Sequence, residues 1–262
     1  MALTHASDLD LIFLFDAPDD AVSDGERSLG ATDYFNRLAK RVVAALSVPT
    51  AAGPLYDVDT RLRPQGEQGM LAVRLDAFEA YQRAEAWTWE HMALLRARPL
   101  YGTKAGRAKL AATVMRVLTL QRDPAKVRAD AAKMRADIAQ HKPPAGPLDI
   151  KLGPGGLVDL EFAVHVLQLV HRQGFDPRLE VAIEALAEAG LIDRQVDPDL
   201  RLLSRMLVTS RLAAPGGGAP EIESQALVAE VCGHADWASL LEAHDAARQR
   251  IATLWAKTKE SP

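Results

Sequence analysis

Residues 7–15 read Ser-Asp-Leu-Asp-Leu-Ile-Phe-Leu-Phe, and this stretch decides the fold of the first part of the chain. Two acids two positions apart, Asp8 and Asp10, open an apolar run of strand length. Side chains at i and i+2 of a strand point to the same face, so the two carboxylates are expected to project side by side. Paired carboxylates on a rigid strand suit Mg2+, which prefers oxygen ligands. The pattern also fits two surface acids at a strand end.

A third acid follows in residues 56–63, which read Tyr-Asp-Val-Asp-Thr-Arg-Leu-Arg. We predict a strand over residues 55–63. Because side chains alternate between the two faces of a strand, four ionisable side chains would lie on one face: Asp57, Asp59, Arg61 and Arg63. Four ionisable side chains on one face of an inner strand are costly unless they face a wet cleft or a ligand. An exposed edge strand with alternating salt bridges is the other interpretation.

If the two strands are neighbours, Asp8, Asp10 and Asp59 converge. Three carboxylates can hold two Mg2+ ions about 3.5–4 Å apart, the spacing that supports in-line displacement at phosphorus. Asp59 is preferred to Asp57 because it lies deeper in the predicted strand. Arg61 and Arg63 are then predicted to bind phosphate oxygens, since a guanidinium group can contact them in a bidentate manner.

The composition excludes several classes of protein. The chain has 262 residues and a formal net charge of -4, which argues against a generally basic nucleic-acid binder. A single cysteine, Cys232, rules out an intrachain disulfide and suits a reducing cytoplasm. The sequence contains no apolar run of membrane-span length. We therefore expect a cytoplasmic protein with no membrane or nucleic-acid partner.

The remainder of the chain is predicted to be mostly helical. In the first part, a helix is expected over residues 32–46, with Thr32 as its N-cap, and a strand over residues 71–73. Two helices follow, one from Asp76 to about residue 83 and another ending near residue 98. No convincing strand is found after Gly102, and helical spacing covers residues 104–122, 124–141, 157–172, 178–189, 197–213, 221–231 and 236–258.

A glycine-rich segment, residues 149–156, precedes one of these helices and contains Lys151. A helix N-terminus preceded by glycines can bind an anion, and a lysine adds positive charge. The alternative is a hinge whose glycines only permit close packing. The residues themselves do not decide between these two interpretations.

Four ordered motifs resemble a known family. They are Ser-Asp-Leu-Asp-Leu-Ile-Phe at residues 7–13, Tyr-Asp-Val-Asp-Thr-Arg-Leu-Arg-Pro-Gln-Gly at 56–66, Glu-Ala-Trp-Thr-Trp-Glu-His-Met-Ala-Leu at 85–94 and Lys-Leu-Gly-Pro-Gly-Gly-Leu-Val-Asp-Leu-Glu-Phe at 151–162. Together they are similar to glutamine synthetase adenylyltransferase, a bifunctional bacterial enzyme with two nucleotidyltransferase halves. The second and third motifs resemble its C-terminal, adenylylating half.

The resemblance implies an α+β fold, in which a polymerase-β-like nucleotidyltransferase palm is followed by an all-α helical bundle. We place the palm at residues 1–103 and the bundle at residues 104–262. It also implies AMP transfer from ATP to a tyrosine hydroxyl of glutamine synthetase, in the regulation of nitrogen assimilation. Asp8, Asp10 and Asp59 would be the Mg2+ ligands and catalytic acids. The resemblance favours a loop at Lys151 that faces the nucleotide, and PII signalling protein is a second expected partner.

Residues 1–6 contain no glycine, whereas the family has a glycine-rich turn shortly before the paired acids. We therefore expect a palm incomplete at its N-terminus that binds ATP poorly. Three alternatives stay open: the deadenylylating, phosphorolytic half of the same family, a non-catalytic regulatory remnant, and another nucleotidyltransferase such as a uridylyltransferase.

Overall fold

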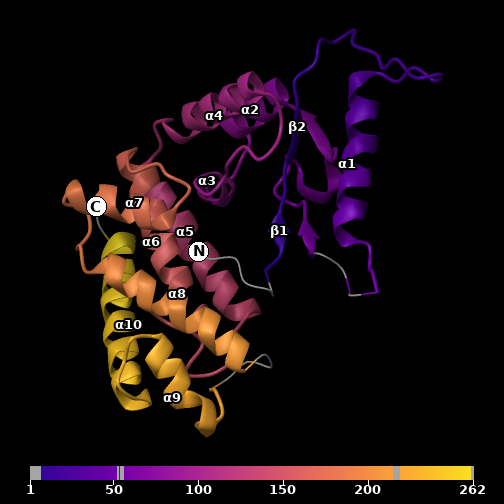
Figure 1. Ribbon diagram of the computed structural model, residues 1–262. Helices are drawn as coiled ribbons and strands as arrows, with labels where there is room; N and C mark the ends of the chain where they lie inside the picture. Colours follow the sequence, from indigo (N-terminus) through magenta and orange to yellow (C-terminus); the bar gives the residue numbers. More distant parts are fainter. Residues whose placement is uncertain (1–6, 52, 54–55, 215–218, 261–262) are drawn as a thin grey trace. The chain divides into compact units, whose positions relative to one another are not determined.

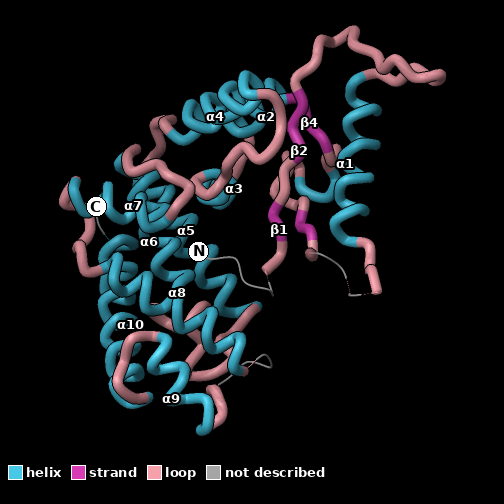
Figure 2. Tube along the Cα trace, in the orientation of Figure 1, coloured by secondary structure: helices cyan, strands magenta, loops and turns pink. Residues whose placement is uncertain are grey.

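The computed structural model describes residues 7–51, 53, 56–214 and 219–260 (Figure 1). The described residues are mostly helical, with a few short parallel strands (Figure 2). The chain divides into two compact units. One contains residues 3–93 and 98–117, and we call it the strand-containing unit. The other contains residues 94–97 and the described residues from 118 onward, and we call it the helical unit.

Two parallel strand pairs organise the strand-containing unit. Strand β1 (Leu9–Asp10) pairs with β3 (Val58–Asp59), and β2 (Phe13–Phe15) pairs with β4 (Ala72–Arg74). The segment predicted as one strand over residues 7–15 thus pairs first with β3 and then with β4. Residues 60–71 form the loop that joins β3 to β4, and this loop includes the short 3-10 helix η1 (Gly66–Gln68). The predicted strand over residues 55–63 is wrong beyond Asp59, and Leu55 lies outside the described residues.

Helix α1 (Ala31–Ser47) connects the two halves of this strand system and packs beside β4. Phe15 and Phe35 stack with ring centroids 4.7 Å apart. Asn36 forms two hydrogen bonds with Ala72, because its Nδ2 donates to the Ala72 carbonyl oxygen and its Oδ1 accepts from the Ala72 N–H, both at 3.1 Å. The predicted helix is confirmed, but its N-cap is Gly30 and not Thr32.

Three further helices complete this part of the chain: α2 (Leu75–Ala84), α3 (Thr88–Leu94) and α4 (Lys104–Leu118). Asp76, predicted to begin α2 as its cap, lies inside the first turn, and Arg74 is the N-cap residue. Glu79 of α2 accepts hydrogen bonds from Arg116 of α4 at 3.0 and 2.6 Å and from Arg83 at 3.1 Å. These arginines lower the pKa of Glu79 to about 2.

The low pKa of Glu79 predicts acid sensitivity. Because the folded pKa of about 2 lies below the ordinary value of 4.5, the stabilisation is fully present above pH 4.5 and is lost as the pH falls toward 2. We expect Glu79→Gln to cost about 1 kcal/mol at pH 7 and to flatten the loss of stability between pH 4.5 and 2. Urea unfolding across this range measures both effects, and parallel pH profiles for the two proteins would contradict the expectation.

The helical unit is built from α5 (Pro124–His141), α6 (Leu157–His171), α7 (Leu179–Glu188), α8 (Val196–Ala213), α9 (Ile222–Val231) and α10 (Trp237–Glu260). All side chains from Leu157 to Leu169 of α6 are buried, so this helix forms the centre of the unit. The predicted start of α5 is confirmed, because Asp123 is its N-cap and accepts a hydrogen bond from the Ala125 N–H. The helices expected after Gly102 are present, with ends within four residues of the predicted ones.

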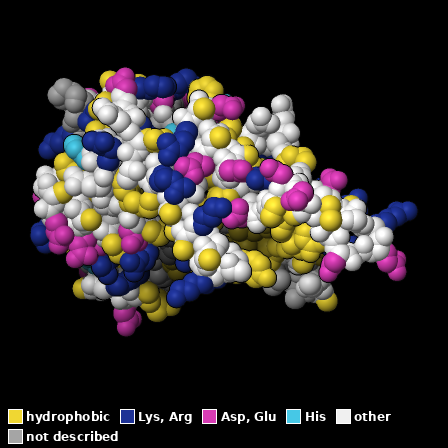
Figure 3. Space-filling model, turned by 90° about the horizontal axis from the view of Figure 1, so that it is seen from above, with side chains coloured by type: hydrophobic (Ala, Val, Ile, Leu, Met, Phe, Trp, Pro, Cys, Tyr) yellow, Lys and Arg dark blue, Asp and Glu magenta, His cyan; other side chains and the backbone are white. Residues whose placement is uncertain are grey.

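The surface carries charge of both signs. Acidic and basic side chains are interspersed on the face shown in Figure 3, as expected for a chain with a net charge of -4. In the part of the chain that the structure describes, no helix is long and apolar enough to cross a membrane. Helix α4, which follows residue 103, belongs to the strand-containing unit up to residue 117, and the domain boundary at residues 103 and 104 stays a prediction.

Candidate functional site

Parallel pairing of β1 with β3 brings two of the predicted acids side by side. Asp10 is the register partner of Asp59, and Leu9 is the partner of Val58. The Leu9 N–H donates to the Asp57 carbonyl oxygen and the Leu11 N–H to the Asp59 carbonyl oxygen, each at 2.8 Å. Neighbouring strands lie about 4.8 Å apart. The strand pair thus fixes the backbones of Asp10 and Asp59 in adjacent positions.

Asp59 is held by the residue that was predicted to bind phosphate. The Arg61 N–H donates to Asp59 Oδ1 at 2.8 Å, and the Arg61 guanidinium contacts both carboxylate oxygens. These hydrogen bonds keep the pKa of Asp59 below its usual range, although burial acts in the opposite direction. Asp59 is therefore ionised at neutral pH, and both of its carboxylate oxygens already accept from a guanidinium group.

The other acids in this region are more exposed. Asp8 precedes β1, and both Asp8 and Asp10 are exposed, as is Asp57. Within the described residues, no group of three or more His, Cys, Asp or Glu side chains is arranged to hold a metal ion. Carboxylate oxygens at Asp10 and Asp59 nevertheless fit the ligand preference of Mg2+. The addition of Asp8 to this pair stays a prediction.

Arg63 has a different environment from Arg61. Its NH1 donates to the Thr60 carbonyl oxygen at 2.7 Å and to Thr60 Oγ1 at 2.9 Å. Its Nε and NH2 donate to the carbonyl oxygens of Gly69 and Glu67, each at 3.2 Å. Arg63 thus links the beginning of the loop between β3 and β4 to its end. Arg61 and Arg63 do not share a strand face, because the strand ends at Asp59, and phosphate binding by either residue stays a prediction.

The glycine-rich segment before α6 is folded tightly against α10. Gly155 has φ of +71°, and a Cβ atom there would lie 2.1 Å from the Arg248 carbonyl oxygen. A Cβ at Gly153 would lie 2.6 Å from the Asp149 carbonyl oxygen. Arg248 in turn donates to the Pro154 carbonyl oxygen at 2.8 Å. These glycines permit close packing within the helical unit, as the hinge interpretation required.

Lys151 lies in this segment and is partly buried. The preceding Asp149 accepts hydrogen bonds from the Lys151 and Leu152 N–H groups at 3.0 and 2.8 Å. These bonds fix the backbone at Lys151. An anion-binding role for the Lys151 side chain stays a prediction.

A buried ion pair that the sequence analysis missed holds the same segment. Arg135 of α5 pairs with Asp159 of α6, and both side chains are at least nine-tenths buried. Asp159 Oδ2 also accepts from the Gly155 N–H at 2.6 Å, and Arg135 NH2 donates to the Leu152 carbonyl oxygen at 3.0 Å. Arg135 lies 24 residues before its partner, so no local spacing could have linked them.

Glu161 of α6 is a second buried acid in this region. Its Oε2 lies 3.8 Å from NH1 of Arg96, within the short segment 94–97 that belongs to the helical unit. Its Oε1 is buried and has no hydrogen-bond partner among the residues that the structure describes. Arg96 comes from the part of the chain before residue 104, so this contact joins two segments far apart in sequence.

Comparisons with known proteins support the resemblance. Residues 1–113 match the family model of glutamate-ammonia ligase adenylyltransferase, and residues 126–213 match that of GlnD PII-uridylyltransferase. A relative from Brucella suis, named bifunctional glutamine synthetase adenylyltransferase/adenylyl-removing enzyme, is 48% identical over 186 residues, which cover 71% of this chain and 19% of the relative.

Two further relatives carry the same name. The one from Rhizobium meliloti is 49% identical over 64% of this chain and 17% of the relative. The one from Rhodopseudomonas palustris is 44% identical over 78% of this chain and 21% of the relative. The chain therefore spans about a fifth of the length of these curated relatives. Its ordered motifs and these matches make the chain similar to part of the bifunctional glutamine synthetase adenylyltransferase/adenylyl-removing enzymes and, over residues 1–113, to the glutamate-ammonia ligase adenylyltransferase family model.

Proposed function

We propose that this chain carries the catalytic acids of an adenylyltransferase that moves AMP from ATP to a tyrosine hydroxyl of glutamine synthetase. The observation that carries the proposal is the parallel register that sets Asp10 beside Asp59. The names of the relatives support the choice of reaction and of glutamine synthetase as substrate. A polymerase-β-like palm is part of this proposal.

The proposed chemistry is an in-line displacement. The tyrosine oxygen bonds to the α-phosphorus of ATP, the bond to the bridging oxygen of pyrophosphate breaks, and the hydroxyl proton passes to a base. Asp8, Asp10 and Asp59 would hold Mg2+, which neutralises charge on the triphosphate. Asp59 is ionised at neutral pH, as an aspartate ordinarily is, and Arg61 lowers its pKa further. In this proposal it serves as a ligand and takes that proton.

Arg61 has a specific place in this proposal. Its side chain is 69% exposed and is held by Asp59. A divalent cation at Asp59 competes with the guanidinium for the same two oxygens. Arg61 displaced in this way would be free to contact phosphate oxygens close to the acids. Cation binding and phosphate binding are thus coupled through one carboxylate.

The experiment measures Mn2+ binding to the whole chain by electron paramagnetic resonance, with Mg2+ as competitor. We expect Asp59→Asn to weaken binding at least about a hundredfold, since an ionised ligand is lost. Asp57→Asn, an exposed acid two residues away, is the matched control and should retain binding. Equal affinity of the two variants, or no competition by Mg2+, would overturn the assignment of the acids.

A second measurement tests the reaction. Transfer of label from α-32P ATP to glutamine synthetase should depend on Asp59 and release pyrophosphate. Label released from adenylylated glutamine synthetase by inorganic phosphate, as ADP, would instead identify the deadenylylating half. Binding of glutamine synthetase without either reaction would identify a regulatory remnant.

One observation favours a second candidate, uridylyl transfer. Residues 126–213 match the uridylyltransferase family model, although this match contains none of the three acids. Labelled UTP in the same assay separates the two, and PII signalling protein is then the acceptor to add. We place either reaction in the cytoplasm.

A further inference from the structure

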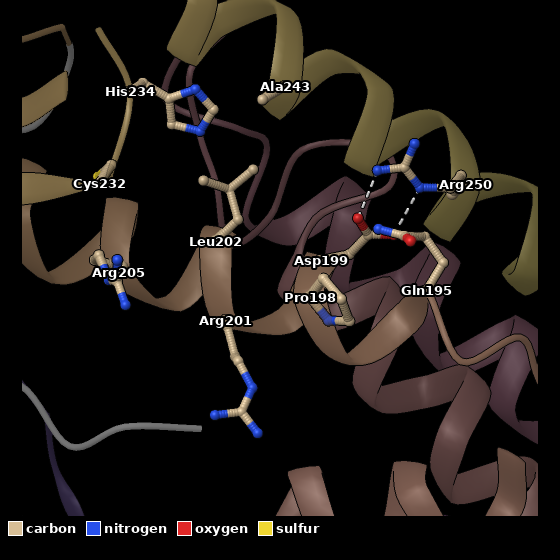
Figure 4. A pocket seen from close by; sticks show the side chains of 10 residues that line it. All are labelled: Gln195, Pro198, Asp199, Arg201, Leu202, Arg205, Cys232, His234, Ala243 and Arg250. Carbon is tan, nitrogen blue, oxygen red and sulfur yellow. Dashed lines mark hydrogen bonds and ion pairs between the residues drawn. The ribbon is translucent and has the colours of Figure 1, made fainter. Parts of the chain in front are cut away.

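The third sequence motif, residues 85–94, has no part in the proposed chemistry, yet it contains a buried acid, Glu90 of α3. The other buried acids that the structure describes each have an arginine partner: Asp159 with Arg135, Glu161 with Arg96, and Asp199 with Arg250, the last shown in Figure 4. Among the described residues, no ion pair joins Glu90 to a cation. Because burying a carboxylate without a cation is costly, Glu90 is expected to have a role beyond packing.

Glu90 holds the hydroxyl group of Tyr81, a residue of α2. Its Oε1 accepts from Tyr81 Oη at 3.0 Å and from the Trp87 N–H at 3.4 Å. Its Oε2 is buried and has no hydrogen-bond partner within the described ranges. The neighbouring His91 places its Nε2 2.9 Å from the Gln82 carbonyl oxygen, which fixes α3 to the end of α2. The direction of the Tyr81 hydroxyl is therefore set by a helix that is itself held in place.

The Tyr81 hydroxyl also meets the loop between β3 and β4. Burial and the neighbouring Glu90 raise the pKa of Tyr81, whereas a hydrogen bond with the Gln65 backbone acts in the opposite direction. Gln65 has φ of +61°, in the left-handed region. A residue other than glycine keeps this conformation only where surrounding groups support it. Tyr81 supplies such support, so the hydrogen bonds of Glu90 and Tyr81 join the third motif to the second.

The turn at Gln65 lies close to the backbone of Arg61. A Cβ atom at the next residue, Gly66, would lie 3.9 Å from the Arg61 carbonyl oxygen. The Gly66 N–H donates to the Arg63 carbonyl oxygen at 2.9 Å. Asp59, by contrast, is fixed by the pairing of β3 with β1. A displaced turn is therefore expected to move Arg61 more than Asp59.

We propose that Glu90 and Tyr81 are positioning residues that keep the Arg61 guanidinium on Asp59. Glu90 orients the Tyr81 hydroxyl, Tyr81 holds the turn at Gln65, and the turn fixes Arg61. The inference rests on the proposed function, in which a divalent cation competes with Arg61 for the Asp59 carboxylate. These hydrogen bonds then set how readily Asp59 exchanges its arginine for a metal ion.

The test repeats the Mn2+ titration of the whole chain with Tyr81→Phe, which removes only the hydroxyl group. Because a loosened turn releases Arg61 from Asp59, we expect this variant to bind Mn2+ about threefold more tightly, a modest coupling for residues in one network. Arg61→Gln should also tighten binding, and Tyr81→Phe should then add nothing further. An equal effect of Tyr81→Phe with and without Arg61 would show a structural role unrelated to Arg61 and would overturn the proposal.

Variants of Glu90 test its part in the network. Glu90→Gln keeps an oxygen that accepts from Tyr81, so it should retain the original affinity for Mn2+, whereas Glu90→Leu should behave like Tyr81→Phe. The control is Tyr34→Phe on α1, which removes the hydroxyl of a tyrosine that is 43% exposed and should leave the affinity unchanged. The proposal is wrong if Tyr81→Phe and Tyr34→Phe have equal effects, or if Glu90→Gln behaves like Glu90→Leu.

Hydrogen exchange separates this inference from the proposed function. Without metal, the backbone amides of residues 60–71 should exchange at least about threefold faster in Tyr81→Phe than in the unaltered chain, as measured by mass spectrometry. If Asp59→Asn leaves Mn2+ binding unchanged, the proposed function fails, and the exchange rates still show whether Tyr81 holds the loop. If Asp59 binds Mn2+ but the exchange rates do not change, this inference alone is wrong.

Discussion

Replacing Asp159 with alanine is expected to destabilise the helical unit by about 3–5 kcal/mol, the cost of leaving one member of a buried ion pair without its partner. The substitution leaves the Arg135 guanidinium buried without a carboxylate and removes the acceptor of the Gly155 N–H. The Arg135 guanidinium and the Gly155 N–H are both buried, so water cannot fully replace the carboxylate that they lose. Urea unfolding at neutral pH, followed by circular dichroism, measures the change.

The matched control is Asp137→Ala. Asp137, like Asp159, pairs with a cation: it accepts a hydrogen bond from Lys133, four residues before it, at 2.9 Å. Its side chain, however, is 50% exposed. Exposed pairs contribute about 0–1 kcal/mol. A loss of stability in Asp159→Ala no larger than that in Asp137→Ala would show that the Arg135–Asp159 pair does not stabilise the unit.

A second variant tests how the pair acts. Arg135→Met combined with Asp159→Leu removes both charges and keeps apolar volume, which often restores the stability lost with one partner. Here recovery should be incomplete, because the Gly155 N–H and the Leu152 carbonyl oxygen still lose their partners. Full recovery would mean that the pair is a simple ion pair that does not anchor the glycine-rich segment.

Substituting Gly155 by alanine is expected to cost about 2–5 kcal/mol. Part of this cost, about 1–2 kcal/mol, is the left-handed backbone conformation at φ of +71°. The rest, about 1–3 kcal/mol, is steric, because the new methyl group would lie 2.1 Å from the Arg248 carbonyl oxygen and α10 must move. The same unfolding experiment measures the total.

Gly190 separates the two contributions. It has nearly the same backbone conformation, with φ of +72°, but a Cβ atom there meets nothing within 4 Å. Gly190→Ala therefore carries only the conformational cost. If the two alanine variants are equally stable, the close approach between residue 155 and α10 does not contribute, and the packing role of the glycine-rich segment is wrong.

The sequence predicted the elements best where local chemistry specifies them. Asp123 followed by Pro124 begins α5, because the aspartate accepts a backbone N–H and proline fits the first helical turn. The spacing of Asp8 and Asp10 predicted a strand, and Asp10 lies on one. The proposed neighbour of this strand was also correct, since β3 pairs with β1.

Local hydrogen bonds from side chains to the backbone account for the wrong end of the predicted strand at residues 55–63. Alternation alone extended the strand at residue 59 to residue 63, but Arg61 turns back onto Asp59 and Arg63 closes the next turn through Thr60 and Gly69. Such side-chain to backbone bonds compete with the strand ladder. In α1, apolar spacing predicted the helix, yet Tyr34 and Leu38 are 43% and 44% exposed while Ala39 is buried.

The helical character of the second part and the pairing of the Asp8–Asp10 segment with the Asp59 segment could be predicted from the sequence, because periodicity, caps and motifs are written in consecutive residues. The fold was needed to show that Arg135 pairs with Asp159 and that Arg248 of α10 anchors the glycine-rich segment. Each of these depends on which distant side chains or backbone groups meet, and that is set by how the elements pack and where the chain turns.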